Sequence, residues 1–253
     1  RAGAAIGTAK NINRSIDILM ALMLQSGAKM TSSDNLTATF DQSVSLASGQ
    51  SFKPGEEALV YYTNFAKPQK VVYTWNDYQH YSIDAFVEGK TAMMFNYSYQ
   101  LPVIRSRAPH LNFGVAALPQ ISATSDKKVS YANYWGLTVS KTSPNSIYAW
   151  TFIKWLTLAD NSKTYLEETK RPIARRDLVD WQKDDQDLGV FAQQSLLARS
   201  WWEADAAATE TIFAQMINDV VSNVSSAQDA VTQASKQVTL LMAEYQRKRQ
   251  AEQ

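Results

Sequence analysis

Cysteine is absent from this chain of 253 residues. Its absence excludes disulfide bonds, thiolate metal sites and cysteine nucleophiles. Histidine is scarce, and His80 and His110 are the only two in the sequence. Their separation does not match the spacing of paired metal ligands. The sequence also lacks a Gly-x-Ser-x-Gly elbow and a glycine-rich phosphate loop. These absences argue against an enzyme, and we expect no metal site, no cofactor and no catalytic residues.

Long apolar runs and an excess of one charge are missing as well. No stretch reaches the roughly 20 apolar residues that span a bilayer, and no signal-peptide pattern follows Arg1. The 25 basic and 24 acidic residues give a formal charge of +1, so the sequence carries no nucleic-acid footprint. The acidic run Asp184–Gly189 lacks the glutamate that closes a calcium loop, and we expect a solvated turn there.

The sequence does contain alternating helical and strand patterns. Apolar residues at helical spacing, bounded by caps, prolines and glycines, predict helices at about 8–27, 54–67, 82–88, 143–156, 161–169, 189–199, 204–222 and 226–246. The first helix has Thr8 as its expected cap and Gly27 as its stop. Short apolar runs between turn residues predict strands at about 91–96, 113–117 and 136–140. Strands that alternate with helices are typical of an α/β fold.

The stretch Phe86–Pro119 carries the most information. It opens with Phe-Val-Glu-Gly-Lys-Thr-Ala-Met, where a short helix ends at glycine and leads into a buried strand, and the strand runs into a tyrosine-rich loop. Three motifs follow in order: a Gly-Leu-Thr-Val-Ser-Lys strand after Tyr134, a helix over Ser146–Leu156, and a helix near Asp229. Their order and spacing resemble the second lobe of the extracellular solute-binding proteins of ATP-driven importers, the family of maltose-binding protein.

The resemblance implies a periplasmic-binding-protein-like (type II) α/β fold. It implies that residues 1–136 form the first part of the second (C-terminal) lobe, that residues 137–177 return to the first (N-terminal) lobe, and that residues 178–253 are the last helices of the second lobe. Most of the first lobe, the signal sequence and any lipid-anchoring cysteine would then lie outside this chain. The apolar face that includes Phe152 and Leu156 would lack the sheet on which it packs.

The resemblance also implies a function. Relatives bind a solute between two lobes that close by a hinge motion, and the closed form docks on a membrane permease. We therefore expect a protein outside the cytoplasm, periplasmic or at the cell surface. It would deliver a solute, with a carbohydrate favoured, to the permease subunits of an ABC importer. Two alternatives stay open: a sensor or adhesin of the same fold that is not coupled to transport, and an enzyme on a similar scaffold.

Seven residues are candidates for contact with the solute: Asn96, Tyr97, Tyr99, Tyr134, Trp135, Trp201 and Trp202. Tyr99 falls where maltose-binding protein carries a tryptophan that stacks on sugar. An aromatic ring packs on the apolar C–H face of a pyranose, while polar neighbours such as Asn96 bind its hydroxyl groups.

Each candidate also has a purely structural interpretation. Tyr97 and Tyr99 could simply cover the end of a strand. Tyr134 and Trp135 lie at the lobe crossing, where relatives often carry two glycines, and a cleft wall and hinge packing are equally open. Two adjacent tryptophans cannot both point into one core, so we expect one of the pair at 201–202 to be partly exposed.

Overall fold

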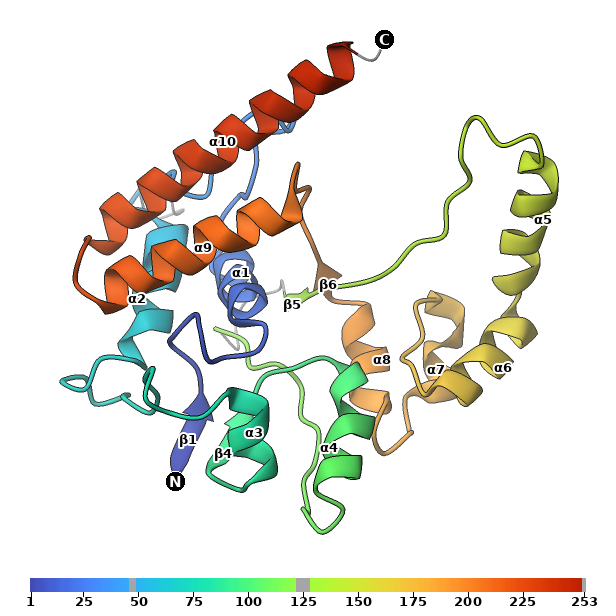
Figure 1. The fold of residues 1–253 in the computed structure, drawn as a ribbon, viewed down its shortest axis with the longest axis horizontal. Helices are drawn as coiled ribbons and strands as arrows, with labels where there is room; N and C mark the ends of the chain where they lie inside the picture. The colour runs from blue at the N-terminus through green and yellow to red at the C-terminus, as the bar shows by residue number, and fades with distance from the viewer. Residues whose placement is uncertain (46–48, 122–127, 252–253) are drawn as a thin grey trace.

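A bundle of four helices forms the body of the molecule (Figure 1). The computed structural model describes residues 1–45, 49–121 and 128–251. The bundle helices are α1 (Ser15–Gln25), α2 (Pro54–Asn64), α9 (Ala206–Val221) and α10 (Ala227–Ala251). Helices α1, α2 and α9 pack against one another, and α10 lies along α9 and α2. Apolar residues three and four positions apart on each helix supply the buried faces.

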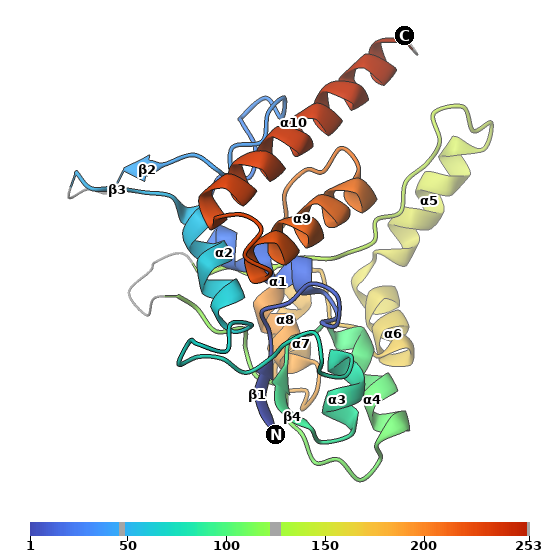
Figure 2. The same cartoon turned by 60° about the vertical axis from the view of Figure 1, so that its left-hand side comes forward.

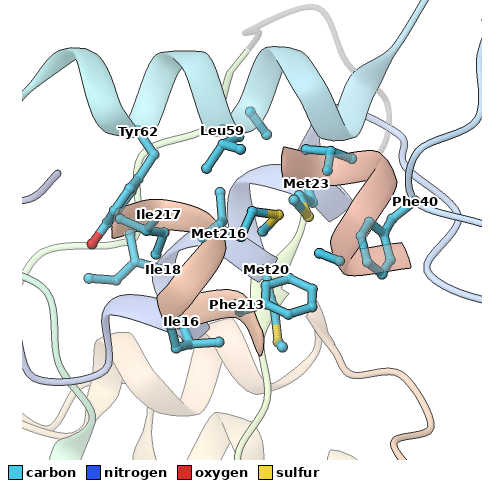
Figure 3. Packing of buried hydrophobic residues seen from close by; sticks show 14 of the residues in the cluster. Ile16, Ile18, Met20, Met23, Phe40, Leu59, Tyr62, Phe213, Met216 and Ile217 are labelled. Carbon is cyan, nitrogen blue, oxygen red and sulfur yellow. The ribbon is translucent and has the colours of Figure 1, made fainter. Parts of the chain in front are cut away.

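The hydrophobic core lies where α1, α2 and α9 meet (Figure 3). Leu19, Leu59 and Phe213 are completely shielded from solvent. The rings of Phe40 and Phe213 have centroids 5.2 Å apart, so the loop after α1 closes one end of this core. Gly55 makes the closure possible, because a Cβ atom at this position would lie 2.0 Å from the carbonyl oxygen of Phe40.

The strands of the described residues are short and occur in three pairs. The parallel pairs are β1 (Ala2–Ala5) with β4 (Thr91–Met94), and β5 (Ser130–Tyr131) with β6 (Ala198–Arg199). The antiparallel pair is β2 (Val44–Ser45) with β3 (Ser51–Phe52). Parallel strands need a long crossover. Between β1 and β4 the crossover holds α1, α2 and α3 (Ser82–Val87), and α4 (Leu101–Arg107) follows β4.

The segment from α5 to α6 stands apart from the bundle (Figures 1 and 2). The remaining elements are α5 (Ser146–Leu156), α6 (Ala159–Thr169), α7 (Val179–Gln182), α8 (Gly189–Ser195) and the 3-10 turns Ser98–Gln100 and Arg176–Leu178. A small second core joins α6 to α7 and α8 through Leu166, Ile173, Leu178, Val179 and Ala192. Helix α5 buries none of its side chains. The stacked rings of Phe152 and Trp155 are both more than half exposed.

Most of the predicted helices are present, but several details of the prediction are wrong. The first helix begins at Ser15 rather than Thr8, because the Thr8 hydroxyl bonds to Asn11 in a turn ahead of the helix. The predicted strands at 113–117 and 136–140 run without a ladder partner among the described residues. Strand β1 and helix α4 were not predicted. In the described part of the chain, no helix is both long enough and apolar enough to cross a bilayer.

The contrast between the bundle core and α5 predicts very different costs for the same substitution. We expect Phe213→Ala to lower the free energy of unfolding by about 3–5 kcal/mol, because the ring is fully buried and its removal leaves a cavity. Phe152→Ala, at a side chain that is 57% exposed, should change it by no more than about 0.5 kcal/mol. Urea denaturation of both variants measures the difference, and equal losses would contradict this account of the core.

Candidate functional site

Four segments that follow the ends of parallel strands meet on one side of α1. The chain after β1 leads to Asn13 and Arg14 at the start of α1, and residues 96–99 follow β4. Residues 131–133 come at the end of β5, and residues 201–203 follow β6. The carboxyl ends of parallel strands are the usual place for ligands in open α/β sheets. The side chains at these four ends are therefore the candidates for a functional site.

Helix α1 divides its residues between the core and this site. Ile16, Leu19 and Met23 face the core. Asp17 and Met20, one and two turns beyond Asn13, take hydrogen bonds from the three other segments. Residues four or three apart share one face of a helix. The packing of Ile16, Leu19 and Met23 therefore fixes the direction of Asp17 and of Met20, which is itself buried in the core.

Tyr97 and Tyr99 form a stacked pair on this side of α1. Their ring centroids are 6.2 Å apart and the ring planes differ by 23°. The Tyr97 hydroxyl donates to Asp17 Oδ2 at 2.7 Å, and Arg14 Nε donates to the Tyr99 hydroxyl at 3.0 Å. The guanidinium carbon of Arg14 lies 5.7 Å from one ring centroid and 5.6 Å from the other, within cation–π range of both. Tyr99 remains 45% exposed.

Asn96 connects the tyrosine loop to the start of α1. Its Nδ2 donates to Asn13 Oδ1 at 3.0 Å, and its own Oδ1 accepts the backbone N–H of Tyr97 at 2.9 Å. The backbone N–H of Asn13 donates to Ser82 Oγ at the first residue of α3. The loop after β4 is thus bonded to Asn13, which is bonded in turn to α3, and this chain of bonds restricts the placement of the tyrosine pair.

A second group of contacts surrounds the sulfur of Met20. Tyr131 shares its single hydroxyl proton between Met20 Sδ at 3.0 Å and Glu203 Oε1 at 3.3 Å. Trp201 Nε1 donates to the same sulfur at 3.3 Å. The Trp201 ring also packs against Phe213, with centroids 6.4 Å apart. These contacts place β5, the segment after β6 and the middle of α1 in one cluster.

Burial controls the charges of this site. Removal from water raises the pKa of the Asp17 carboxyl, although hydrogen bonding from Tyr97 and the charge of Arg14 oppose the shift. Burial, and then the negative charges of Asp17 and Glu210, raise the pKa of Glu203 to about 7, against the lowering effect of the bond from Tyr131. The pKa values of the Tyr97 and Tyr131 hydroxyls are raised by burial and by the neighbouring carboxylates, so both remain donors.

The structure separates the seven residues predicted from the sequence. Asn96, Tyr97, Tyr99 and Trp201 belong to the cluster around α1. Trp202 instead packs edge-on against Tyr245 of α10, with ring centroids 5.3 Å apart. Tyr134 and Trp135 lie further along the chain after β5, where they are 74% and 94% exposed.

Sequence reasoning missed Arg14, Asp17, Tyr131 and Glu203. The strand β5 was not predicted, so Tyr131 was not recognised as the end of a strand. Asp17 is the one charged side chain of α1, which is otherwise mostly apolar, and that contrast would have indicated it. The histidines form no metal site: His80 pairs with Glu88 at 3.1 Å, and no group of three or more metal-ligating side chains occurs in residues 1–45, 49–121 and 128–251.

Comparison with known proteins identifies a family and a fold. The profile of the family described as bacterial extracellular solute-binding protein matches residues 8–192. Similar solved structures include an ABC transporter solute-binding protein of Thermotoga lettingae bound with α-D-tagatose, with 20% identity and a TM-score of 0.68 over 95% of this chain and 59% of that one. The cyclic α-maltosyl-1,6-maltose binding protein of Arthrobacter globiformis has 17% identity and a TM-score of 0.67 over 96% and 60% of the two chains.

A third similar structure is the GacH receptor of Streptomyces glaucescens, solved unliganded and with acarbose. It has 18% identity and a TM-score of 0.69 over 96% of this chain and 60% of that one. At these identities the likeness establishes the fold and confirms the predicted α/β class. The chain spans about three fifths of the length of these structures. A comparison with curated protein sequences gave no match.

The raised pKa of Glu203 predicts that stability depends on pH. The ordinary pKa of this carboxyl is 4.5 and the folded value is about 7, so between these values the folded protein holds a proton that the unfolded chain has released. The contribution is present below pH 4.5 and is lost as the pH rises through about 7. We expect the free energy of unfolding to fall from pH 5 to pH 7, and Glu203→Gln to flatten that fall, in urea denaturation at several pH values.

The matched control is Glu57→Gln, at an exposed carboxyl on α2. It should leave the pH dependence of the free energy of unfolding as it is in the wild type. A Glu203→Gln variant with the wild-type pH dependence would show that Glu203 is not the titrating group.

Proposed function

Because this chain belongs to the bacterial extracellular solute-binding proteins, with the periplasmic-binding-protein fold, we propose that it binds a carbohydrate and delivers it to the permease of an ABC importer. The family consists of binding proteins, so the chain is not an enzyme. The family is also extracellular, which agrees with a position outside the cytoplasm. Attachment to the cell surface through a lipid belongs to the proposal.

The observation that carries the proposal is the tyrosine pair at the end of β4. Tyr99 has an accessible ring, and both hydroxyl groups are held by α1. An exposed ring with fixed orientation suits the apolar face of a sugar. The side chains of Asn13, Asp17 and Asn96 surround the pair with the donors and acceptors that sugar hydroxyls need. Two of the similar structures are named for sugars that they bind, α-D-tagatose and cyclic α-maltosyl-1,6-maltose, and this supports a carbohydrate as the solute.

The other candidate residues take outer positions in this proposal. Trp201 shares the Met20 cluster and extends the aromatic wall beyond Tyr131. The exposed rings of Tyr134 and Trp135 would meet the solute, or the opposite wall, when the site closes. Trp202 would contribute at the edge, where Tyr245 supports it.

We propose that closure involves a first lobe outside this sequence. In this division, residues 1–136 and 178–253 belong to the second lobe, and residues 137–177 return to the first. The exposed rings of α5 support a first-lobe partner for that helix, because a folded domain rarely leaves such an apolar face uncovered. The small second core lies at the boundary of this division, since it joins α6 to α7 and α8. Closure of two lobes by a hinge would then enclose the solute against the stacked rings of Tyr97 and Tyr99, here called the tyrosine wall.

The site predicts that Tyr99→Ala weakens solute binding far more than it weakens folding. Loss of a stacked aromatic contact costs about 1–3 kcal/mol, so the dissociation constant should rise roughly ten- to hundredfold. The measurement is calorimetry with the sugar that gives the largest thermal shift among D-tagatose, maltose and maltotriose. Tyr78→Ala, at a tyrosine that is 97% exposed in the turn ahead of α3, is the control and should bind as the wild type does.

Other outcomes would correct the proposal in different ways. A wild-type dissociation constant in Tyr99→Ala, together with a lower melting temperature, would assign Tyr99 to packing. If the thermal-shift screen is extended to peptides and amines, stabilisation by these compounds and by none of the sugars would exclude the carbohydrate. Tight sugar binding without uptake by cells that carry the protein would favour a sensor.

The lobe division predicts weak protection of α5 in hydrogen exchange. Amides of residues 146–156 should exchange at least about a hundredfold faster than those of residues 206–221, because local opening of α5 exposes no buried side chain. In a protein lengthened to include a first lobe, the amides of residues 146–156 should become protected. Strong protection of α5 in the monomeric chain of 253 residues would contradict the division.

A further inference from the structure

Arg14 has an unusual backbone conformation. Its φ and ψ are 61° and 29°, in the left-handed region, at the residue that precedes α1. A side chain in this region is crowded by its own backbone, and such residues occur disproportionately at functional sites. Among the described residues, the other non-glycine positions with positive φ are Asn35, Lys170 and Asn223. Asparagine tolerates the region better than long side chains do, so Arg14 and Lys170 stand out.

The conformation of Arg14 coincides with contacts to both tyrosines. The guanidinium carbon is nearly equidistant from the two ring centroids, at 5.7 and 5.6 Å, while Nε donates to the Tyr99 hydroxyl. A single side chain therefore fixes the spacing of Tyr97 and Tyr99 as well as the rotation of Tyr99. The next residue, Ser15, is buried and begins the helix, so α1 anchors the backbone of this arginine directly.

Arg14 also keeps unused hydrogen-bond donors. A guanidinium group has five N–H donors, and the bond to Tyr99 uses the one on Nε. Within residues 1–45, 49–121 and 128–251, the two terminal amino groups have no acceptor at hydrogen-bond distance and no carboxylate within 4.0 Å. Asp17 acts on Arg14 only through its charge at longer range. The residue is half-buried, and the bond from its Nε to the Tyr99 hydroxyl is itself open to solvent, so solvent reaches the guanidinium group beside the tyrosine pair.

We propose that Arg14 is a positioning residue of the solute-binding wall, which holds Tyr97 and Tyr99 in their stacked arrangement and donates its terminal amino groups to hydroxyl oxygens of the bound sugar. The inference rests on the proposed function. It adds Arg14 to the binding residues, and folding holds Arg14 in an unfavourable left-handed backbone conformation. Its consequence is a trade-off: relief of the backbone crowding at residue 14 should help folding and harm binding.

Arg14→Gly tests the trade-off, because glycine adopts the left-handed region without crowding and removes the side chain. With the best-binding sugar of the panel above, the dissociation constant should rise at least about tenfold, while the melting temperature stays equal to or above that of the wild type. The near-ultraviolet circular dichroism of the tyrosines should change, since the stacked pair loses its support. Arg14→Lys keeps the charge but not the planar fork, and should bind with intermediate affinity.

Lys170→Gly is the matched control, because it relieves the same conformation at another basic residue, the exposed C-cap of α6. Its dissociation constant should stay within about twofold of the wild-type value. Wild-type affinity in Arg14→Gly, or a fall in melting temperature that parallels the loss of affinity, would overturn the inference and leave the proposed function intact. If no sugar of the panel binds the wild type, the proposed function fails and the inference fails with it.

Discussion

The packing of the apolar face of α1 against α2 and α9 is the constraint on which the rest of the structure depends. Ile16, Leu19 and Met23 leave that helix only one orientation in the core. Close packing in protein interiors tolerates little rotation of such a helix. Asp17 and Met20 are therefore directed toward the ends of the strands, where the tyrosine loop, β5 and the segment after β6 converge on them. The proposed binding wall, assembled from distant parts of the sequence, thus inherits its rigidity from the core beneath it.

Two carboxyl groups of this wall, those of Asp17 and Glu203, are half-buried, and their removal from water costs free energy of folding. Asp17 and Glu203 have no ion pair within 4.0 Å among the described residues, and their raised pKa values report the loss of water around them. Tyrosine hydroxyl groups provide partial compensation, because Tyr97 donates to one carboxyl and Tyr131 to the other. A ligand rich in hydroxyl groups would supply the remaining donors without adding a charge that the site must neutralise. This reasoning favours a polar, uncharged solute over an anionic one, since an anion would face two acidic groups.

The sequence predicted those parts of the fold that local chemistry determines. Pro54 begins α2, and the helix before Gly89 leads into β4, as expected from their caps and breakers. The tyrosine loop was recognised because it follows a strand of unmistakable pattern. Arg14 and Asp17 could not be found in the same way, because their partners lie 85 and 80 residues away in the sequence. The predicted strand at 136–140 failed for a related reason, since a strand needs a partner and none is present in the described chain.

The tyrosine wall is held by many side-chain contacts and helix α5 by few. This difference is consistent with the proposed closure of the protein on its ligand. The tyrosine wall is fixed through side-chain bonds to α1, and preorganisation of this kind limits the entropy lost on binding. Helix α5, in contrast, buries no side chain. It is joined to the wall by an extended stretch that has no strand partner in the described part of the chain. A helix whose apolar face lacks a partner contributes little to its own stability, so its position depends on whatever covers it. Motion between a rigid wall and a separately packed segment requires that the connection carry few contacts, and the chain between β5 and α5 meets that requirement.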